Sequence, residues 1–155
     1  MEYGLATPRK FTLVAGTGEG STELNAFDHA LLAAGIGNVN LLRVSSILPS
    51  GAVYAERLEI EPGSLVPTAY GAITSEQPGQ LIAAAIGVGL SEDTYGVIME
   101  FSGRCSRAEA ERHVRGMVEE AFGTRGLALK TCLVKAVEHR VKQKGCAFAA
   151  TALWY

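Results

Sequence analysis

The stretch LVPTAYGAITSEQPGQLIAAAIGVGLSEDTYGVIMEFS, residues 65–102, contains three apolar runs in succession. We predict strands at Leu65–Thr74, Gln80–Val88 and Tyr95–Ser102, because each run is bounded by turn-forming residues. No helical pattern separates these runs. The arrangement is typical of a sheet whose strands follow one another along the chain.

A first strand is predicted upstream at Lys10–Ala15, ending in a glycine-rich turn, Gly16–Gly20. A helix then begins at Ser21 or Thr22, since both are good N-cap residues. It runs to Ala34 and stops at the following glycine. Helical spacing predicts that one face carries Leu24, Phe27, Asp28, Leu31 and Leu32. An aspartate therefore lies within the apolar stripe of this helix.

A second helix is marked near the other end of the chain. Ser106 and Glu109 have the spacing of a capping box, and Gly123 is expected to end the helix. The apolar positions that follow at helical spacing are Ala110, Val114, Met117, Val118 and Ala121.

Further strands are predicted at Val39–Val44 and Cys146–Trp154. The segment Leu129–Val141 is ambiguous, because its polar residues suit neither the helical nor the strand period. Residues Lys142–Gly145 are interpreted as a hairpin turn between the last two strands. Few helices and many strands predict an α+β layered sandwich with a mainly antiparallel sheet, folded as a single domain over residues 1–155.

Composition excludes several classes of protein. The 155 residues are 48% hydrophobic and 19% charged, which favours an ordered globule. A net charge of −2 with scattered Lys and Arg does not fit a nucleic-acid or membrane-surface protein, and suits a small or cationic ligand better.

The segments that bear on location indicate a cytoplasmic protein. Residues Met1–Lys10 have no apolar run that would form a signal peptide, and Leu81–Leu90 is too short to span a bilayer. The three cysteines, Cys105, Cys132 and Cys146, are odd in number and lack metal-type spacing. We interpret them as reduced core residues, and we expect no metal site.

Two segments could carry chemistry. Gly16–Gly20 lies between a strand and a helix, as in phosphate-binding loops, but its spacing matches no phosphate fingerprint, and a tight turn is the simpler interpretation. Ser45 and Ser46 end a predicted strand shortly before Pro49. A serine pair alone would be interpreted as two turn hydroxyls, because no nearby His or Lys completes an ordinary nucleophile.

Three longer stretches surround or follow the serine pair. They are LNAFDHALLAAGIGNVNLLRVSSILP (residues 24–49), GVIMEFSG (residues 96–103) and GCAFAA (residues 145–150). Together they resemble the pyruvoyl-dependent arginine decarboxylase family, and the likeness covers roughly Lys10 to Tyr155. Ser50 departs from the pattern, since many members have a second proline there, but the reacting residues are unaffected.

The resemblance implies that the chain breaks its own backbone between Ser45 and Ser46. The Ser46 hydroxyl would attack the Ser45 carbonyl, and elimination would then release residues 1–45 from residues 46–155. Residue 46 would become a covalent pyruvoyl cofactor, whose ketone takes up the substrate amine and acts as the electron sink for loss of CO₂. Asn40 matches the family asparagine that assists this processing. Without the resemblance it would be interpreted as a strand-edge residue that satisfies a neighbouring loop.

The resemblance also implies a proton donor and a substrate pocket. Glu100 lies between apolar residues, so desolvation would raise its pKa and let it protonate the substrate carbon, although simple alternation would point it outward. Asp28 would accept the guanidinium of L-arginine through paired hydrogen bonds; the alternative is an aspartate that caps a loop. The pocket would be lined by Leu24, Leu31, Gly37, Val39 and Ile47.

The expected reaction is decarboxylation of L-arginine to agmatine, carried out by a homotrimer or a higher assembly. Polyamine synthesis or acid resistance would suit the product. Two alternatives remain at this point: a non-processing trimeric scaffold or ligand-binding protein of the same fold, and a pyruvoyl decarboxylase acting on another basic amino acid.

Overall fold

The computed structural model describes residues 4–155; the first three residues of the segment Met1–Lys10 lie outside it. The helices are α1 (Glu23–Ala34) and α2 (Arg107–Arg125). The strands are β1 (Lys10–Glu19), β2 (Asn40–Arg43), β3 (Ile47–Leu48), β4 (Val53–Tyr54), β5 (Leu65–Ser75), β6 (Leu81–Leu90), β7 (Gly96–Gly103), β8 (Thr131–Arg140) and β9 (Gly145–Trp154).

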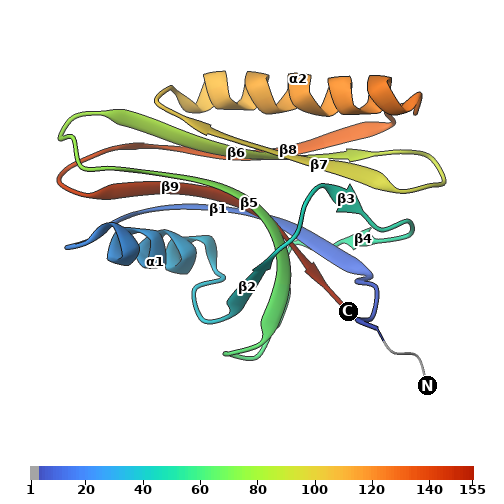
Figure 1. The fold of residues 1–155 in the computed structure, drawn as a ribbon, viewed down its shortest axis with the longest axis horizontal. Coiled ribbons are helices and arrows are strands. Elements are labelled where there is room, and N and C mark those ends of the chain that lie inside the picture. The colour runs from blue at the N-terminus through green and yellow to red at the C-terminus, as the bar shows by residue number, and fades with distance from the viewer. Residues whose placement is uncertain (1–3) are drawn as a thin grey trace.

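Two sheets lie face to face, with one helix on each outer side (Figure 1). Sheet A has the strand order β2-β5-β9-β1-β4, and sheet B has the order β3-β7-β6-β8. Sheet B is antiparallel throughout, whereas sheet A includes the parallel pairs β1/β4 and β2/β5. The α1 helix packs on sheet A, and α2 packs on sheet B. The predicted α+β layered sandwich is confirmed.

The space between the sheets is the main core. It is filled by alternate residues of the facing strands, among them Phe11 and Leu13 from β1, and Ile82 and Ile86 from β6. Each of these side chains is buried, and burial of apolar surface is the principal driving force for stacking two sheets.

Six predicted strands are confirmed within one or two residues of their ends, as β2 and β5–β9. The ambiguous segment Leu129–Val141 forms strand β8. Strands β3 and β4 were not predicted, because each is two residues long and too short to show any periodicity.

The predicted hairpin at Lys142–Gly145 is wrong. The β8 strand pairs with β6 in sheet B, whereas β9 pairs with β1 and β5 in sheet A, so the connection crosses between the layers. Nine of the ten residues of β9 are buried. A strand buried on both faces suits the centre of a sheet, and β9 accordingly has a neighbour on each side.

The predicted turn Gly16–Gly20 is also wrong, because β1 continues through Glu19. Its alternate glycines lie directly beneath α1. A Cβ atom added to Gly16 would come within 2.3 Å of the Ala30 carbonyl oxygen, and one added to Gly18 within 2.6 Å of the Ala30 nitrogen. The glycines therefore allow close helix–sheet packing rather than a turn or a phosphate cradle.

The α1 helix begins after Thr22, whose side chain accepts a hydrogen bond from the Asn25 N–H, and ends at Gly35 with φ of 85°. Its predicted apolar face is partly wrong. Ala26 and Ala30 are fully buried, while Leu24 is 75% and Leu32 48% exposed. The glycine surface of β1 admits only small side chains at the contact, so the larger ones lie on the flank.

The capping box of α2 is confirmed, since Ser106 and Glu109 bond each other's backbone N–H groups. The helix continues past Gly123, however, and ends at Gly126 with φ of 66°. Leu127 N–H then donates to the Phe122 carbonyl, which secures the end. No helix in residues 4–155 is both long and apolar enough to cross a membrane.

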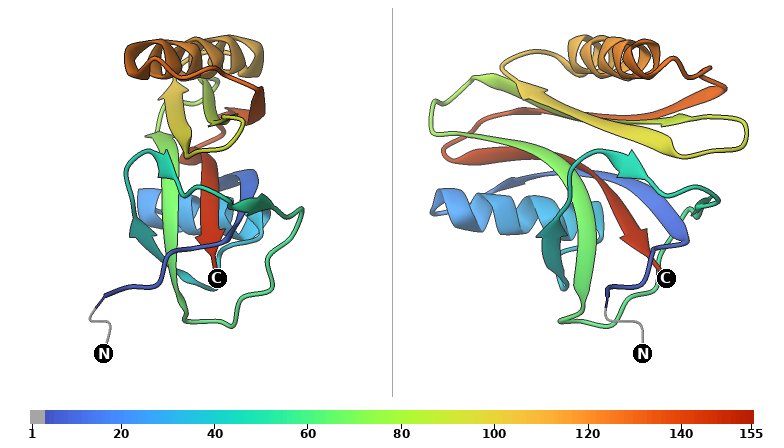
Figure 2. Two further views of the ribbon diagram at one scale, coloured as in Figure 1. Left: turned by 90° about the vertical axis from the view of Figure 1, so that its right-hand side faces the viewer. Right: turned by 45° about the vertical axis from the view of Figure 1, so that its right-hand side comes forward.

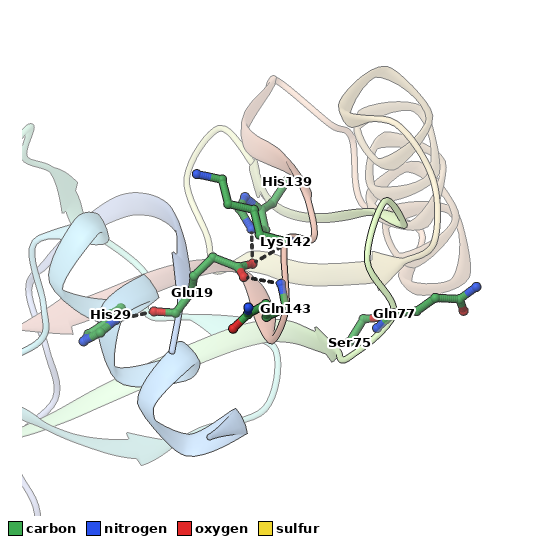
Figure 3. A network of polar contacts seen from close by, with 7 residues as sticks. All are labelled: Glu19, His29, Ser75, Gln77, His139, Lys142 and Gln143. Carbon is green, nitrogen blue, oxygen red and sulfur yellow. Dashed lines mark hydrogen bonds and ion pairs between the residues drawn. The ribbon is translucent and has the colours of Figure 1, made fainter. Parts of the chain in front are cut away.

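Glu19, at the end of β1, joins the two sheets on one side of the sandwich (Figure 3). Its carboxylate accepts hydrogen bonds from His139 Nε2 on β8 at 2.6 Å, and from the Gln143 N–H at 2.8 Å and the Lys142 N–H at 3.3 Å in the crossing loop. The imidazole of His29 on α1 donates to the backbone carbonyl of Glu19. Burial opposes ionisation of Glu19, but these hydrogen bonds outweigh it and hold its pKa below 4.5.

We expect Glu19→Gln to lower the free energy of unfolding by about 2 kcal/mol near neutral pH, because the charge-assisted hydrogen bonds are lost. The pKa of Glu19 is lower in the folded chain, so its contribution is complete above 4.5 and disappears as the pH falls through the folded value. Denaturant unfolding from pH 7 to pH 3 checks this, and the two proteins should converge at the acidic end.

The matched control is Glu76→Gln, which removes a surface ion pair with Lys144 at 3.5 Å beside the same crossing loop. It should change the unfolding free energy by less than about 0.5 kcal/mol. An equal effect of both substitutions, or a Glu19→Gln difference that persists at pH 3, would contradict the assignment.

Candidate functional site

The serine pair lies where the chain passes from one sheet to the other. The β2 strand belongs to sheet A and β3 to sheet B, and only Val44, Ser45 and Ser46 connect them. Figure 2 shows this turquoise segment from two further sides. The Val44 N–H donates to the Thr68 carbonyl at 3.1 Å, and the Ser46 carbonyl accepts from the Ile98 N–H at 2.7 Å. The Ser45–Ser46 peptide bond is therefore held from both sides.

Glu100 lies close to this crossing. In the antiparallel pair β3/β7, Ile47 faces Val97, and the Ser46–Ile98 hydrogen bond extends the register by one residue. Before Ser46 the chain turns to β5, and the Arg43 side chain of β2 brings its Nη2 to 3.9 Å from Glu100 Oε1.

The Glu100 side chain points between the sheets. A Cβ added to Gly71 of β5 would lie 3.2 Å from the Glu100 Cβ, and the Glu100 side chain is 32% exposed. Burial raises the pKa of Glu100, and the Arg43 guanidinium partly opposes this. Alternation along the strand predicted that Glu100 points away from Met99 and Phe101, and this is correct. That face is not the outer side of the protein, however, because it is turned toward sheet A.

Arg43 is a residue that the sequence analysis did not single out. It ends β2, and its Nη2 lies 3.9 Å from Glu100 Oε1 and 2.9 Å from the Tyr70 carbonyl oxygen. The one available signal was an arginine within the strand that leads to the serine pair. Nothing in a single sequence indicates that this side chain reaches β5 and β7, since those contacts join segments far apart in the chain.

Asn40 lies at the other end of β2 and faces a loop. Its side-chain amide donates to the Gly63 carbonyl at 3.1 Å, and its backbone N–H donates to the Ser64 carbonyl at 2.8 Å. A strand advances roughly 3.3 Å per residue, so Arg43 lies about 10 Å further along. Within one chain, Asn40 is thus held away from the serine pair.

Asp28 is exposed on α1. Its neighbour Phe27 packs on Tyr70 of β5, with ring centroids 6.1 Å apart. The helix turn that carries Asp28 therefore faces the β5 side of sheet A. The α1 helix covers the outer face of this sheet, whereas Glu100 belongs to sheet B, so these two carboxylates come from different layers.

The predicted pocket residues are divided in the same way. Leu31 is buried and packs near Val39, while Leu24 is 75% and Ile47 43% exposed. Gly37 lies against Leu32, whose side chain would be 2.5 Å from an added Cβ. Ser46 and Ile47 lie along β7, two and three residues before Glu100 in its register, and neither they nor Glu100 share a cavity with Asp28 and Leu24.

Two cavities of the chain lie elsewhere. One of 760 Å³ is lined by the N-terminal segment, Ser50, Gly51 and Tyr155, and one of 520 Å³ lies under residues 56–60. Neither includes the serine pair or Glu100.

This arrangement combines a hydroxyl next to a fixed peptide carbonyl with a carboxyl group whose pKa is raised by burial. The hydroxyl and the carbonyl allow a serine side chain to attack the neighbouring backbone carbonyl. The carboxyl group can donate a proton at a higher pH than an ordinary glutamic acid. A carboxylate on the neighbouring helix offers a partner for a cationic ligand.

Comparison with known proteins gives a consistent result. A family model described as pyruvoyl-dependent arginine decarboxylase (PvlArgDC) matches residues 10–155. A relative of that name from Methanocaldococcus jannaschii is 53% identical over 150 residues, covering 96% of this chain and 91% of the relative. Relatives of the same name from Pyrococcus abyssi and Methanococcus maripaludis are each 47% identical, again over 96% of this chain, and are covered over 96% and 92% of their own lengths.

Proposed function

This chain belongs to the pyruvoyl-dependent arginine decarboxylase family, and we propose that it converts L-arginine to agmatine and CO₂ after cleaving itself between Ser45 and Ser46. The observation that carries the proposal is the position of this peptide bond. It lies in the crossing between the sheets, its neighbours are anchored at Val44 and Ser46, and Arg43, two residues before Ser45, reaches to 3.9 Å from Glu100.

The proposed cleavage needs no external enzyme. The Ser46 hydroxyl attacks the Ser45 carbonyl carbon, and the amide C–N bond breaks to leave an ester and a free amine. Elimination then breaks the ester C–O bond, giving a carboxylate on Ser45 and dehydroalanine at residue 46. Addition of water and loss of ammonia convert this residue to a pyruvoyl group. The products are residues 1–45 and 46–155.

Two features of the chain favour the first step. The hydrogen bond from Ile98 fixes the Ser46 backbone, and that from Val44 to Thr68 fixes the chain just before Ser45. Holding the nucleophile and carbonyl in one geometry removes much of the entropic barrier. Asn40 is the proposed assistant, and its amide must then leave the Gly63 carbonyl or be supplied by a neighbouring copy.

The pyruvoyl group supplies a carbonyl that binds the substrate amine and withdraws the electrons released with CO₂. The residues of the chain provide the rest of the chemistry. Glu100 holds a proton that is delivered to the substrate α-carbon, and burial keeps a share of this carboxyl protonated at higher pH than usual. Asp28 accepts the guanidinium, and Leu24, Leu31, Gly37, Val39 and Ile47, contributed by neighbouring copies of the chain, line the aliphatic part of the substrate.

Intact-mass spectrometry of purified protein should show fragments 1–45 and 46–155, the larger one blocked by a pyruvoyl group, with agmatine formed from arginine. Ser46→Ala removes the attacking hydroxyl, so we expect one uncleaved chain of about 16.3 kDa and no agmatine. Ser50→Ala, four residues along the same segment, is the control and should cleave normally.

Cleavage of Ser46→Ala would refute the assigned site. A wild-type chain that stays whole on incubation and forms no agmatine would favour the non-catalytic scaffold instead.

Asp28→Asn keeps the shape of the side chain and removes the charge that selects the guanidinium. We expect the KM for arginine to rise about 10- to 100-fold, as for loss of charge-assisted hydrogen bonds, with unchanged self-cleavage. Glu23→Gln removes a carboxylate from the same helix and should leave KM within about twofold. Equal kinetics for Asp28→Asn and wild type would contradict the role of Asp28, and comparing arginine with lysine and ornithine tests the substrate class.

We also propose a cytoplasmic homotrimer or higher assembly, with sites completed between copies. The support is an edge strand with exposed apolar neighbours: Leu42 on β2 is 41%, Leu65 on β5 59% and Leu24 75% exposed. An unpaired strand edge and exposed large apolar side chains favour association. The three cysteines are free thiols, as in proteins of a reducing compartment.

Light scattering should give three or more times the 16.3 kDa mass of one chain. Leu42→Glu places a charge on the proposed contact and should reduce that mass. Val53→Glu, at the opposite edge of sheet A on β4, should not. A monomeric wild type, or dissociation by Val53→Glu alone, would show that the wrong edge has been assigned.

A further inference from the structure

The β5 strand has an edge that β2 covers only in part. The two strands pair from Leu65 to Thr68, and β5 then continues to Ser75 without a neighbour on that side. Backbone carbonyls alternate in direction along a strand, so those of Thr68, Tyr70 and Ala72 all face this edge. Unpaired backbone groups at such an edge require other partners.

Three different groups provide these partners. The Thr68 carbonyl accepts from the Val44 N–H at 3.1 Å, the Tyr70 carbonyl from Arg43 Nη2 at 2.9 Å, and the Ala72 carbonyl from the Ser102 hydroxyl at 3.1 Å. The Arg43 side chain thus continues the hydrogen bonding of β2 after the backbone has turned away toward the serine pair. Ser102 closes the edge from β7.

The guanidinium of Arg43 is fixed by more than one contact. Its central carbon lies 4.3 Å from the centroid of the Tyr70 ring, a cation–π distance, and the same residue supplies the carbonyl acceptor. Its Nη2 lies 3.9 Å from Glu100 Oε1. At that separation the two side chains interact as charges rather than through a hydrogen bond, so it is Tyr70 that determines where the cation stands.

Arg43 and Glu100 belong to different products of the cleavage. Arg43 lies within residues 1–45, whereas Glu100 and Tyr70 lie within residues 46–155. The cleaved N-terminal fragment would still present its cation to the carboxyl group of the other fragment, because β2 remains paired with β5.

We propose that Arg43 is a positioning residue of the mature enzyme: held on the free edge of β5 by Tyr70, it sets the orientation and protonation of Glu100. This inference rests on the proposed function and adds a role for Arg43, which acts through Glu100 and not on the substrate. It also means that the N-terminal fragment remains a working part of the enzyme after cleavage.

The charges around Glu100 allow the direction of the effect to be derived. Met99 and Phe101 pack toward α2, so Glu100 faces the opposite way, toward sheet A. On β6 its cross-strand partner is the apolar Ile86, beyond which Lys135 of β8 occupies the same row. The neighbouring strands β3 and β9 contribute apolar side chains there, and β5 contributes Gly71.

Arg43 is the cation within ion-pair distance of Glu100 in the described chain. Burial raises the pKa of Glu100, and Arg43 lowers it. Removing Arg43 should therefore raise this pKa further. If protonated Glu100 donates the proton, the alkaline limb of the kcat profile moves to higher pH, because the acid form persists longer.

The test measures kcat and KM for arginine from pH 5 to pH 10 with Arg43→Met, after intact mass has established the fraction of cleaved chain. We expect kcat at the wild-type optimum to fall roughly 10- to 100-fold, as for a misplaced catalytic group. We also expect an alkaline limb shifted to higher pH, and a KM within about twofold. Arg140→Met is the matched control, since Arg140 also donates to a backbone carbonyl, that of Gly79 at 2.8 Å.

Arg43→Lys keeps the positive charge without the planar fork. It should restore the alkaline limb toward the wild-type position while kcat stays reduced, and it serves as the second variant if Arg43→Met does not fold or cleave. Adding Arg43→Met to Glu100→Gln should leave the residual pH profile unchanged, because the group through which Arg43 acts is absent.

An unchanged pH profile with kcat within about twofold, in cleaved Arg43→Met, overturns the proposal. So does an Arg43→Met profile shift of the same size in the Glu100→Gln background. Failure of the wild-type chain to cleave or to form agmatine refutes the proposed function itself. This outcome is measured first, so it is distinguished from failure of the Arg43 proposal.

Discussion

The structure depends on the stacking of two sheets over one shared apolar interior. Neither sheet is stable alone, because each has one face of buried aliphatic and aromatic side chains that must be removed from water. The chain is not divided into one segment for each sheet. It changes sheet at residues 44–46, 49–52, 76–80 and 141–144, so the layers are joined by four short crossings. The serine pair occupies the first of these crossings.

Small residues allow helix α1 to pack closely on sheet A. Alternate glycines on β1 let the backbone of α1 lie against the strand, and only alanines fit on the helix at that contact. This close packing places the larger side chains of α1, together with Asp28, on the flank of the helix and not beneath it. The Asp28 carboxylate is thus left accessible by the same geometry that buries its neighbours.

The region around the serine pair gains its chemistry from the edge of the sandwich. Fully inside, an ionisable carboxyl would have no partner, and fully outside it would have an ordinary pKa. Glu100 lies between these limits, where β5 extends beyond β2 and the side chains of Arg43 and Ser102 bond its free carbonyls. The Arg43 side chain both satisfies a backbone carbonyl and places a positive charge 3.9 Å from Glu100.

Particular residues show where sequence-based prediction succeeds. The helix ends at Thr22, Ser106 and Gly35 are local signals, because the side chains of Thr22 and Ser106 bond the N–H group three residues ahead and Gly35 adopts the left-handed backbone that ends a helix. The strands β5, β6, β7 and β9 were likewise evident as apolar runs. The family was also evident, since its motifs consist of contiguous residues such as those around Ser45 and Ser46.

Other features were decided only by tertiary structure. The alternate glycines of β1 have the local pattern of a turn, but in the fold they lie beneath a helix. Lys142–Gly145 has the local pattern of a hairpin, but the strands it connects belong to different sheets. The contact of Arg43 with Tyr70 and Glu100 joins three strands separated by many residues. The sequence by itself therefore determined most of the local elements and the family, because these depend on neighbours along the chain. Only the folded structure decided which strands pair, which face α1 buries and what surrounds Glu100. These features depend on apolar surfaces from segments far apart in the chain, which are buried against each other.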